Sequence, residues 1–143
     1  MSIIYRAPVS DAEIEMAAEV ESLCLSTAWS KSQIANLSEY ACYYCAIEDG
    51  LVCGIASMYT LAGEGQIMNI AVLPTHRRRR IGHGLMAVLV KEAQSKNCEI
   101  ITLEVAEDNY SAISLYEAYG FSVAGRRNGF YKGKDALIME KKL

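Results

Sequence analysis

The sequence predicts an α/β fold in which one mixed sheet carries helices on both faces. Up to residue 73, strand-like runs are separated by short glycine turns, an arrangement typical of antiparallel hairpins. Beyond it, strand and helix patterns alternate as β-α-β-α-β, which favours crossover helices and parallel pairing. With 143 residues, 52% of them hydrophobic, the chain is long enough for one compact core. No repeat or linker interrupts it, so the sequence predicts a single domain over 1–143.

In the first half, short helices and hairpin strands alternate. Ser10 or Asp11 caps a helix whose apolar residues, with Glu21 among them, recur at helical spacing. Ser30 caps a second, shorter helix, and Glu48-Asp49-Gly50 is a hairpin turn. The predicted elements are a strand over 3–6, helices over 11–25 and 31–37, and strands over 42–47, 51–59 and 66–73.

In the second half, the apolar period changes from two to that of a helix. Leu85, Leu89 and Ala93 form one stripe of a helix, while Asn109 caps the next helix and Gly120 ends it. The predicted elements are a helix over 82–96, a strand over 100–105, a helix over 109–119, a strand over 121–124, a polar loop over 125–135 and a last strand over 136–140.

A basic glycine loop, Arg79 to Gly84, lies between a predicted strand and a predicted helix. The first N–H groups of a helix have no partner within it, and they carry the positive end of its dipole. Glycines admit a phosphate close to the backbone and the arginines add charge, so a diphosphate ligand is predicted. The alternative is a solvated charge run, or a nucleic-acid patch, over Arg77–Arg80. The net charge of −3 argues against general nucleic-acid binding.

Composition limits the other classes of protein. No apolar run approaches the length of a membrane span, and the acidic N-terminal segment is unlike a signal peptide, so a cytoplasmic protein is expected. The five cysteines are an odd number and are expected to be free thiols. Cys42 and Cys45 lie on opposite faces of a predicted strand, which disfavours a metal site or redox pair. We expect no metal.

Five segments together resemble the GNAT acetyltransferase superfamily, and within it the RimI branch, the ribosomal-protein N-terminal alanine acetyltransferases. The loop matches the signature [Gln/Arg]-x-x-Gly-x-[Gly/Ala]. The other segments are Leu103-Glu104-Val105, Asn109, Ala112 to Tyr116, and Tyr119-Gly120-Phe121. The resemblance implies the GNAT fold: a single, mostly antiparallel sheet with a splayed parallel strand pair at its centre.

The resemblance also implies acetyl-CoA as cosubstrate. In that family the loop wraps the pyrophosphate, while the strand before it offers backbone groups to the pantetheine arm and a backbone N–H to the acetyl oxygen. Asn109 would cap its helix and also contact the cofactor. The implied cofactor-binding residues are Ile70, Ala71, Val72, Arg78, Arg79, Arg80, Ile81, Gly82, His83, Gly84 and Asn109. His76 and His83 flank the loop, where they contact phosphate or are simply exposed.

Two residues are candidates for proton transfer. Glu104 shares a strand face with Ile100 and Thr102, and the pattern alone leaves a solvent-exposed carboxylate and a general base equally open. Tyr116 shares a helix face with other apolar residues, so spacing alone favours a core tyrosine. The resemblance implies that Glu104 is the base that accepts the proton of the amine and that Tyr116 is the acid that protonates the thiolate.

The acceptor side is predicted less directly. By resemblance, Tyr131 and Trp29 frame the acceptor peptide; for Trp29, a hydrophobic plug over the core is the alternative. The sequence departs from the branch at Gly129-Phe130, where relatives often carry tyrosine, and at Arg80, where many carry glycine.

The predicted function is transfer of acetyl from acetyl-CoA to the N-terminal α-amine of a protein, an Ala-initiated ribosomal protein by resemblance, by direct attack in a ternary complex. Glu104, Glu107 and Asp108 would suit a basic peptide. The alternatives are a lysine or small-molecule amine as acceptor, a non-catalytic acyl-CoA sensor and an RNA-binding module. No direct nucleic-acid or membrane partner is expected.

Overall fold

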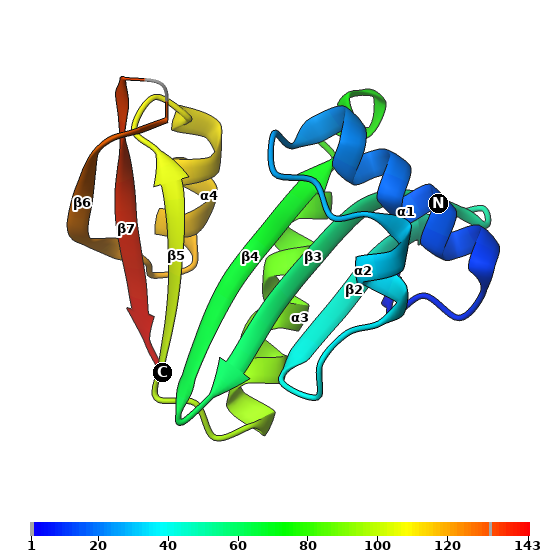
Figure 1. Ribbon diagram of the computed structural model, residues 1–143, viewed down its shortest axis with the longest axis horizontal. Coiled ribbons are helices and arrows are strands. Elements are labelled where there is room, and N and C mark those ends of the chain that lie inside the picture. The colour runs from blue at the N-terminus through cyan, green and yellow to red at the C-terminus, as the bar shows by residue number, and fades with distance from the viewer. Residues whose placement is uncertain (1, 132) are drawn as a thin grey trace.

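The structure, a computed structural model, describes residues 2–131 and 133–143, with Tyr131 described by its backbone alone. In these residues seven strands form one sheet in the order β1-β2-β3-β4-β5-β7-β6 (Figure 1). The elements are β1 (Ile4–Arg6), α1 (Asp11–Cys24), α2 (Lys31–Ala35), β2 (Ala41–Glu48), β3 (Leu51–Leu61), β4 (Glu64–Val72), a 3₁₀ turn (Pro74–His76), α3 (Ile81–Ser95), β5 (Ile100–Ala106), α4 (Tyr110–Ala118), β6 (Ser122–Tyr131) and β7 (Lys134–Lys142).

The predicted helix caps are confirmed. The Ser10 side chain accepts a hydrogen bond from the backbone N–H of Glu13, and Ser30 forms a reciprocal capping box with Gln33. Gly120 follows α4 with φ 89°, a left-handed conformation that ends the helix at low cost.

The prediction of a polar loop over 125–135 is wrong. Most of it belongs to β6 and β7, which pair as an antiparallel hairpin from Ser122↔Glu140 to Tyr131↔Lys134. β6 is an edge strand and its described side chains are largely exposed, so it has no apolar alternation to mark it as a strand. Its register also slips between Arg127 and Tyr131, which further interrupts a period of two.

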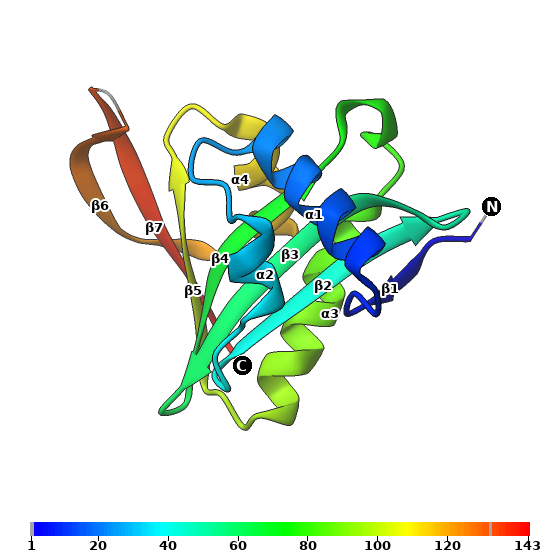
Figure 2. The same ribbon diagram turned by 45° about the vertical axis from the view of Figure 1, so that its right-hand side comes forward.

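Helices cover both faces of the sheet, as predicted (Figure 2). α1 and α2 pack on one face through Ala17, Val20 and Ile34, and the side chains of α3 and α4 belong to a single core cluster on the other face. Cys42 and Cys45 lie in different clusters, so their thiols are on opposite faces and do not pair. None of the helices in the described residues is long and apolar enough to span a bilayer.

The central strands β4 and β5 are parallel and separate along their length. Their pairing runs only from Glu64↔Ile100 to Gln66↔Thr102, and beyond that point the two strands diverge (Figure 1). On its other side β4 stays paired with β3 as far as Val72. The later part of β4 therefore has one edge without a neighbouring strand, which confirms the predicted splayed pair.

A bulge in β4 changes which residues face which helices. Ser57 of β3 lies opposite Asn69 but the next residue, Met58, lies opposite Ile67, so Met68 is the extra residue. Before the bulge, Ile67 packs on the α3 side, and after it Ala71 packs on the α1 side. An inserted residue shifts the alternation of a strand by one position. The bulge thus turns Asn69 toward α1 and Ile70 toward α3.

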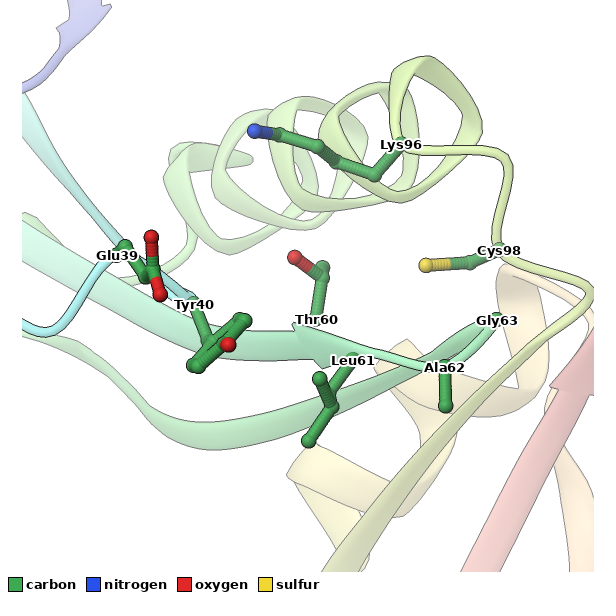
Figure 3. A pocket seen from close by; sticks show the side chains of 8 residues that line it. All are labelled: Glu39, Tyr40, Thr60, Leu61, Ala62, Gly63, Lys96 and Cys98. Carbon is green, nitrogen blue, oxygen red and sulfur yellow. The ribbon is translucent and has the colours of Figure 1, made fainter.

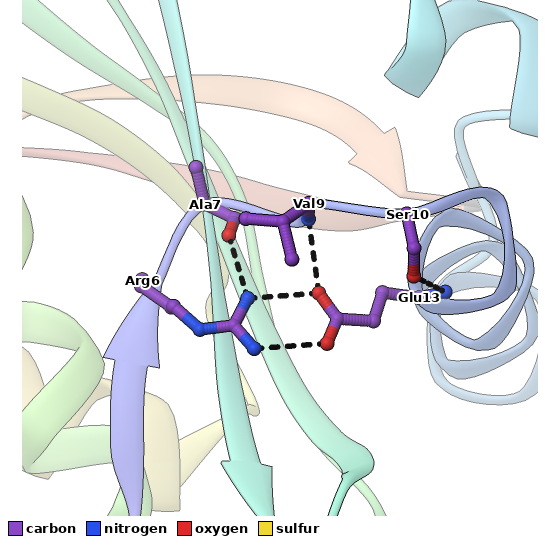
Figure 4. A network of polar contacts seen from close by, with 5 residues as sticks. All are labelled: Arg6, Ala7, Val9, Ser10 and Glu13. Carbon is purple, nitrogen blue, oxygen red and sulfur yellow. Dashed lines mark hydrogen bonds and ion pairs between the residues drawn. The ribbon is translucent and has the colours of Figure 1, made fainter.

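One charge network at the start of α1 makes stability depend on pH (Figure 4). The Arg6 guanidinium donates to both Glu13 carboxylate oxygens at 2.8 and 2.9 Å, and the Val9 N–H donates to one of them at 2.9 Å. These bonds, that of Arg6 foremost, lower the pKa of Glu13 to about 2. A depressed carboxyl pKa stabilises the fold above the unfolded-state pKa, and this contribution is lost as the pH falls toward the folded-state value.

We therefore expect Glu13→Gln to lower the Tm at pH 7, and the difference from wild type to shrink as the pH falls from about 4.5 to about 2. Thermal melts followed by circular dichroism across this range measure it. A Tm difference that stays constant from pH 7 to pH 2 would contradict the role given to the ion pair.

Candidate active site

A groove with a volume of about 740 Å³ opens where β4 and β5 have separated. Its walls come from the later part of β4, the basic loop and start of α3, and α4, with Cys24 and Leu25 at the end of α1. Of the predicted cofactor-binding residues, Arg79 and Gly84 do not line the groove. Those that do are Ile70, Ala71, Val72, Arg78, Arg80, Ile81, Gly82, His83 and Asn109. The fold thus joins three segments that are far apart in the sequence.

The start of α3 suits an anion. Arg80 is the N-cap residue, and its side chain makes no capping hydrogen bond. The first N–H groups of α3 therefore open on the groove with the positive end of the helix dipole. Arg78 and Arg80 have φ values of 64° and 62°, a left-handed conformation that costs about 1–2 kcal/mol per residue. In the described part of the chain neither forms an ion pair, so both guanidinium groups are available to a diphosphate.

The other two arginines of the run are held by the protein. Arg77 Nε donates to the Val72 carbonyl oxygen at 3.1 Å, and Arg79 forms an ion pair with Glu48 at the end of β2. His76 Nε2 lies 3.5 Å from the same carboxylate. The neighbouring Arg79 guanidinium, helped by His76, holds the pKa of Glu48 below its usual value. Arg77, Arg78 and Arg80 all line the groove, but only Arg78 and Arg80 have guanidinium groups that no hydrogen bond or ion pair within the described residues engages.

Gly84 lies against an aromatic ring rather than in the groove. A Cβ atom at this position would lie 2.1 Å from Cζ of Tyr5, far inside van der Waals contact. The Tyr5 ring is half-buried, and burial raises the pKa of its hydroxyl. The signature accepts alanine here, but in this chain Tyr5 occupies the space that the methyl group needs.

We expect Gly84→Ala to lower the free energy of unfolding by about 1–3 kcal/mol, because Tyr5 must leave its site to admit the methyl group. Urea unfolding measures it. In a Tyr5→Leu background the same change is expected to cost distinctly less, since the two sites are coupled. Equal costs in both backgrounds would show that Tyr5 does not set this requirement for glycine.

Glu104, the predicted base, lies on the α1 side of β5. Ile101, Leu103 and Val105 pack on the α3 side, so Glu104 shares the opposite face with Ile100 and Thr102, as predicted. Its side chain is 27% exposed, and it forms an ion pair with Arg127 of β6, whose Nε lies 2.7 Å from Oε1. No pattern in the sequence predicts this ion pair. Glu104 lies beyond the last residue of β5 that pairs with β4, so it lies beside the separation of these strands.

Tyr116, the predicted acid, lines the groove from α4. It is 6% exposed, and its ring centroid lies 6.0 Å from that of Phe121. It belongs to the core cluster on the α3 side of the sheet. Glu104 and Tyr116 therefore approach the separated strands from opposite faces, and their roles stay predictions. Asn109 caps α4 by accepting from the Ala112 N–H at 3.3 Å, and it also lines the groove.

Trp29 and Tyr131, the residues predicted to contact the acceptor, lie in different parts of the fold. Trp29 lies in the loop between α1 and α2, and its ring centroid is 6.1 Å from those of both Tyr43 and Tyr59. Trp29 is half-buried and packs against the core cluster that includes α1, as expected if it is a hydrophobic plug over the core. It is not among the residues that line the groove. Tyr131 pairs with Lys134 through its backbone, while its side chain lies outside the described part of the structure.

The carboxylates near the β6–β7 hairpin already have cationic partners. Arg126 pairs with Asp135 at 2.7 Å and with Glu107 at 3.4 Å, and Lys134 pairs with Asp108 at 2.5 Å. The Lys134 ammonium lowers the pKa of Asp108. Glu107 and Asp108 are thus engaged within the protein, which weakens the hypothesis that they attract a basic peptide.

One residue near the groove, Glu21 of α1, is not among the site residues predicted from the sequence. It is completely buried, one turn before Cys24 and Leu25 at the groove wall. The signal was present, because a carboxylate inside an apolar helical stripe requires buried donors. A second cavity, of about 320 Å³, lies near the other end of β3, beside Tyr40, Lys96 and Cys98, and none of the predicted site residues line it (Figure 3).

Comparison with known proteins identifies the family. Residues 11–121 match the model of the acetyltransferase (GNAT) family. The chain belongs to this family, and it is an N-acetyltransferase.

Its relatives include enzymes that act on protein N-termini. It is 29% identical over 132 residues to the ribosomal protein bS18-alanine N-acetyltransferase of Escherichia coli (strain K12), covering 89% of each chain. It is 33% identical over 125 residues to an N-alpha-acetyltransferase of Saccharolobus solfataricus, covering 77% of this chain and 75% of that protein. The crystal structure of the E. coli ribosomal-protein-S18-alanine N-acetyltransferase superposes with a TM-score of 0.87 at 27% identity, covering 99% of this chain and 94% of that one. The predicted resemblance to the RimI branch is confirmed.

Proposed function

We propose that this protein transfers the acetyl group of acetyl-CoA to the N-terminal α-amine of a protein, and that the acceptor is a ribosomal protein beginning with alanine. The observation that carries the proposal is the groove at the separated strands, whose wall contains the uncapped N-terminus of α3 and Tyr116. Glu104 does not line the groove itself but lies on β5 beyond its last pairing with β4. The names of the relatives support an N-terminal acceptor. We further propose that residues 1–143 act as one catalytic domain.

The groove fits the parts of acetyl-CoA in order. The N–H groups at the start of α3 and the guanidinium groups of Arg78 and Arg80 would hold the diphosphate. Backbone groups of Ile70 and Ala71, on the edge of β4 without a strand partner, would bind the pantetheine arm. The carbonyl oxygen of Val72 is less available, because it already accepts from Arg77 Nε.

The chemistry then requires that the acceptor nitrogen lose two protons, that the departing thiolate gain one and that one oxygen be stabilised. Glu104 accepts the proton of the acceptor ammonium, directly or through a water, so that the free amine attacks the acetyl carbonyl. A backbone N–H near Ile70 stabilises the charge that develops on the carbonyl oxygen. Tyr116 donates its hydroxyl proton to the departing thiolate, because a phenol has a pKa near that of a thiol. The second proton, which the nitrogen loses after the attack, passes to solvent, and the tyrosinate takes up a proton from solvent. Both substrates bind together, so no acetyl group is carried by the enzyme.

The acceptor is tested with peptides that differ only at the first residue: the same sequence beginning with Ala, Ser or Met, and an Ala peptide whose N-terminus is blocked. We expect the highest kcat/KM for the Ala peptide and no reaction of the blocked one. Equal rates on all four peptides would point to a lysine acceptor. Turnover on small amines alone would overturn the peptide acceptor and leave the proposed cofactor site unaffected.

The five free thiols suit a reducing compartment, so we propose that the reaction takes place in the cytoplasm.

A further inference from the structure

The buried carboxylate of Glu21 connects three separate segments of the chain. Its Oε1 accepts from the Trp29 backbone N–H at 2.8 Å and from Asn69 Nδ2 at 2.6 Å. Its Oε2 accepts from the Tyr43 hydroxyl at 2.5 Å. The donors lie in the loop after α1, in β4 and in β2. In the described residues no cation pairs with Glu21, so these three donors satisfy its two carboxyl oxygens.

A buried carboxylate that is held by hydrogen bonds contributes little to the stability of a fold. Desolvating a carboxylate is costly, and replacing a buried polar cluster by apolar side chains of similar size is often neutral or stabilising. Burial, and then the hydrogen bond to Glu21, raises the pKa of Tyr43, so this tyrosine remains a donor. The cluster is fully paired, and its geometry fixes the relative positions of the segments that it joins.

Two of those segments belong to the site. Asn69 directly follows the bulge residue Met68 and precedes Ile70, which lines the groove. On the other side, the Leu25 N–H donates to the Glu21 carbonyl oxygen at 2.9 Å, so Glu21 ends α1 with its backbone and holds the following loop with its side chain. This loop, which contains Trp29, runs from Leu25 at the rim of the groove to the start of α2.

We propose that Glu21 is a positioning residue, which fixes the Trp29 loop against the bulged segment of β4 and so sets where the acceptor amine meets the acetyl group. The proposal rests on the proposed function for the identity of the acceptor. Glu21 touches neither substrate, because it is fully buried. It acts through the Trp29 backbone and through Asn69.

Matched substitutions separate positioning from packing. Glu21→Met keeps the length of the side chain and removes both acceptors. Glu21→Gln keeps an oxygen for the Trp29 N–H and Asn69. Glu92→Met is the control, since Glu92 of α3 also accepts from a tyrosine hydroxyl, that of Tyr44 at 2.7 Å, but packs on the other face. If Glu21→Met does not fold, the triple variant Glu21→Met/Tyr43→Phe/Asn69→Leu is used in its place. It also removes the two side-chain donors that would otherwise be left without an acceptor.

The first readout needs no acceptor. Trp29 is the single tryptophan of the chain, so its emission and its quenching by acrylamide report on this loop directly. We expect Glu21→Met, or the triple variant, to show a red-shifted emission and stronger quenching with native far-UV circular dichroism. Glu21→Gln and Glu92→Met are expected to match wild type.

The second readout is steady-state kinetics on the amine that wild type acetylates. A misplacement of about 1 Å costs about 100-fold in rate, so kcat/KM for the acceptor should fall about 10- to 100-fold in Glu21→Met. The KM for acetyl-CoA should stay within about twofold, and Glu21→Gln should restore most of the rate. Wild-type quenching together with wild-type kinetics in a folded Glu21→Met or triple variant would overturn the proposal. If wild type acetylates no peptide, the proposed function fails, while Trp29 quenching still decides whether Glu21 holds the loop.

Discussion

Replacing Glu104 by Gln is expected to reduce kcat by about 10²- to 10⁴-fold, the range that general bases contribute. The amide is nearly the same shape but cannot take the proton of the acceptor ammonium. It also loses the ion pair with Arg127, whose Nε lies 2.7 Å from the carboxylate. Initial rates with saturating acetyl-CoA and acceptor measure the change.

The matched control for Glu104 is Glu107→Gln, because Glu107 lies near the end of the same strand and is paired with Arg126. We expect the control to keep its rate within about threefold. A second variant, Arg127→Gln, separates proton transfer from the ion pair, since it leaves the carboxylate in place. Full activity of Glu104→Gln, or equal losses in Glu104→Gln and Glu107→Gln, would remove Glu104 from the mechanism.

Replacing Tyr116 by Phe is expected to lower kcat by about 10²-fold with little change in the KM for acetyl-CoA. The variant keeps the ring against Phe121, 6.0 Å away, and loses the hydroxyl that protonates the thiolate. Tyr119→Phe is its control: this hydroxyl donates to the His83 carbonyl oxygen at 2.8 Å and does not line the groove. Retention of wild-type kcat by Tyr116→Phe would show that water or another group supplies the proton.

Much of the fold was predictable because its signals are local. Ser10, Ser30 and Asn109 each cap a helix where the pattern placed a cap, since a side-chain oxygen at a helix start has few other roles. The β6–β7 hairpin was not predictable in this way. Its strand β6 is exposed, so burial does not impose an alternating pattern on it.

The candidate site was predictable in its residues more than in its contacts. The basic loop and its position before α3 follow from the sequence, as does the face that Glu104 shares with Thr102. Arg79 in the loop before α3 pairs with Glu48 of β2, and Arg127 of β6 pairs with Glu104 of β5. No local pattern indicates such partners, because they come from elements that are far apart in the sequence. The burial of Glu21 likewise depends on Tyr43 and Asn69, which only the folded sheet brings to α1.

The most direct test of the central claim is the position of the acetyl group on one peptide that carries both a free N-terminal alanine and an internal lysine. The peptide is incubated with the protein and acetyl-CoA, and the product is fragmented in a mass spectrometer. We expect a single acetyl group on the α-amine of the alanine. Acetyl on the lysine side chain, or an unmodified peptide while acetyl-CoA is bound, would contradict N-terminal acetylation as the function of this protein.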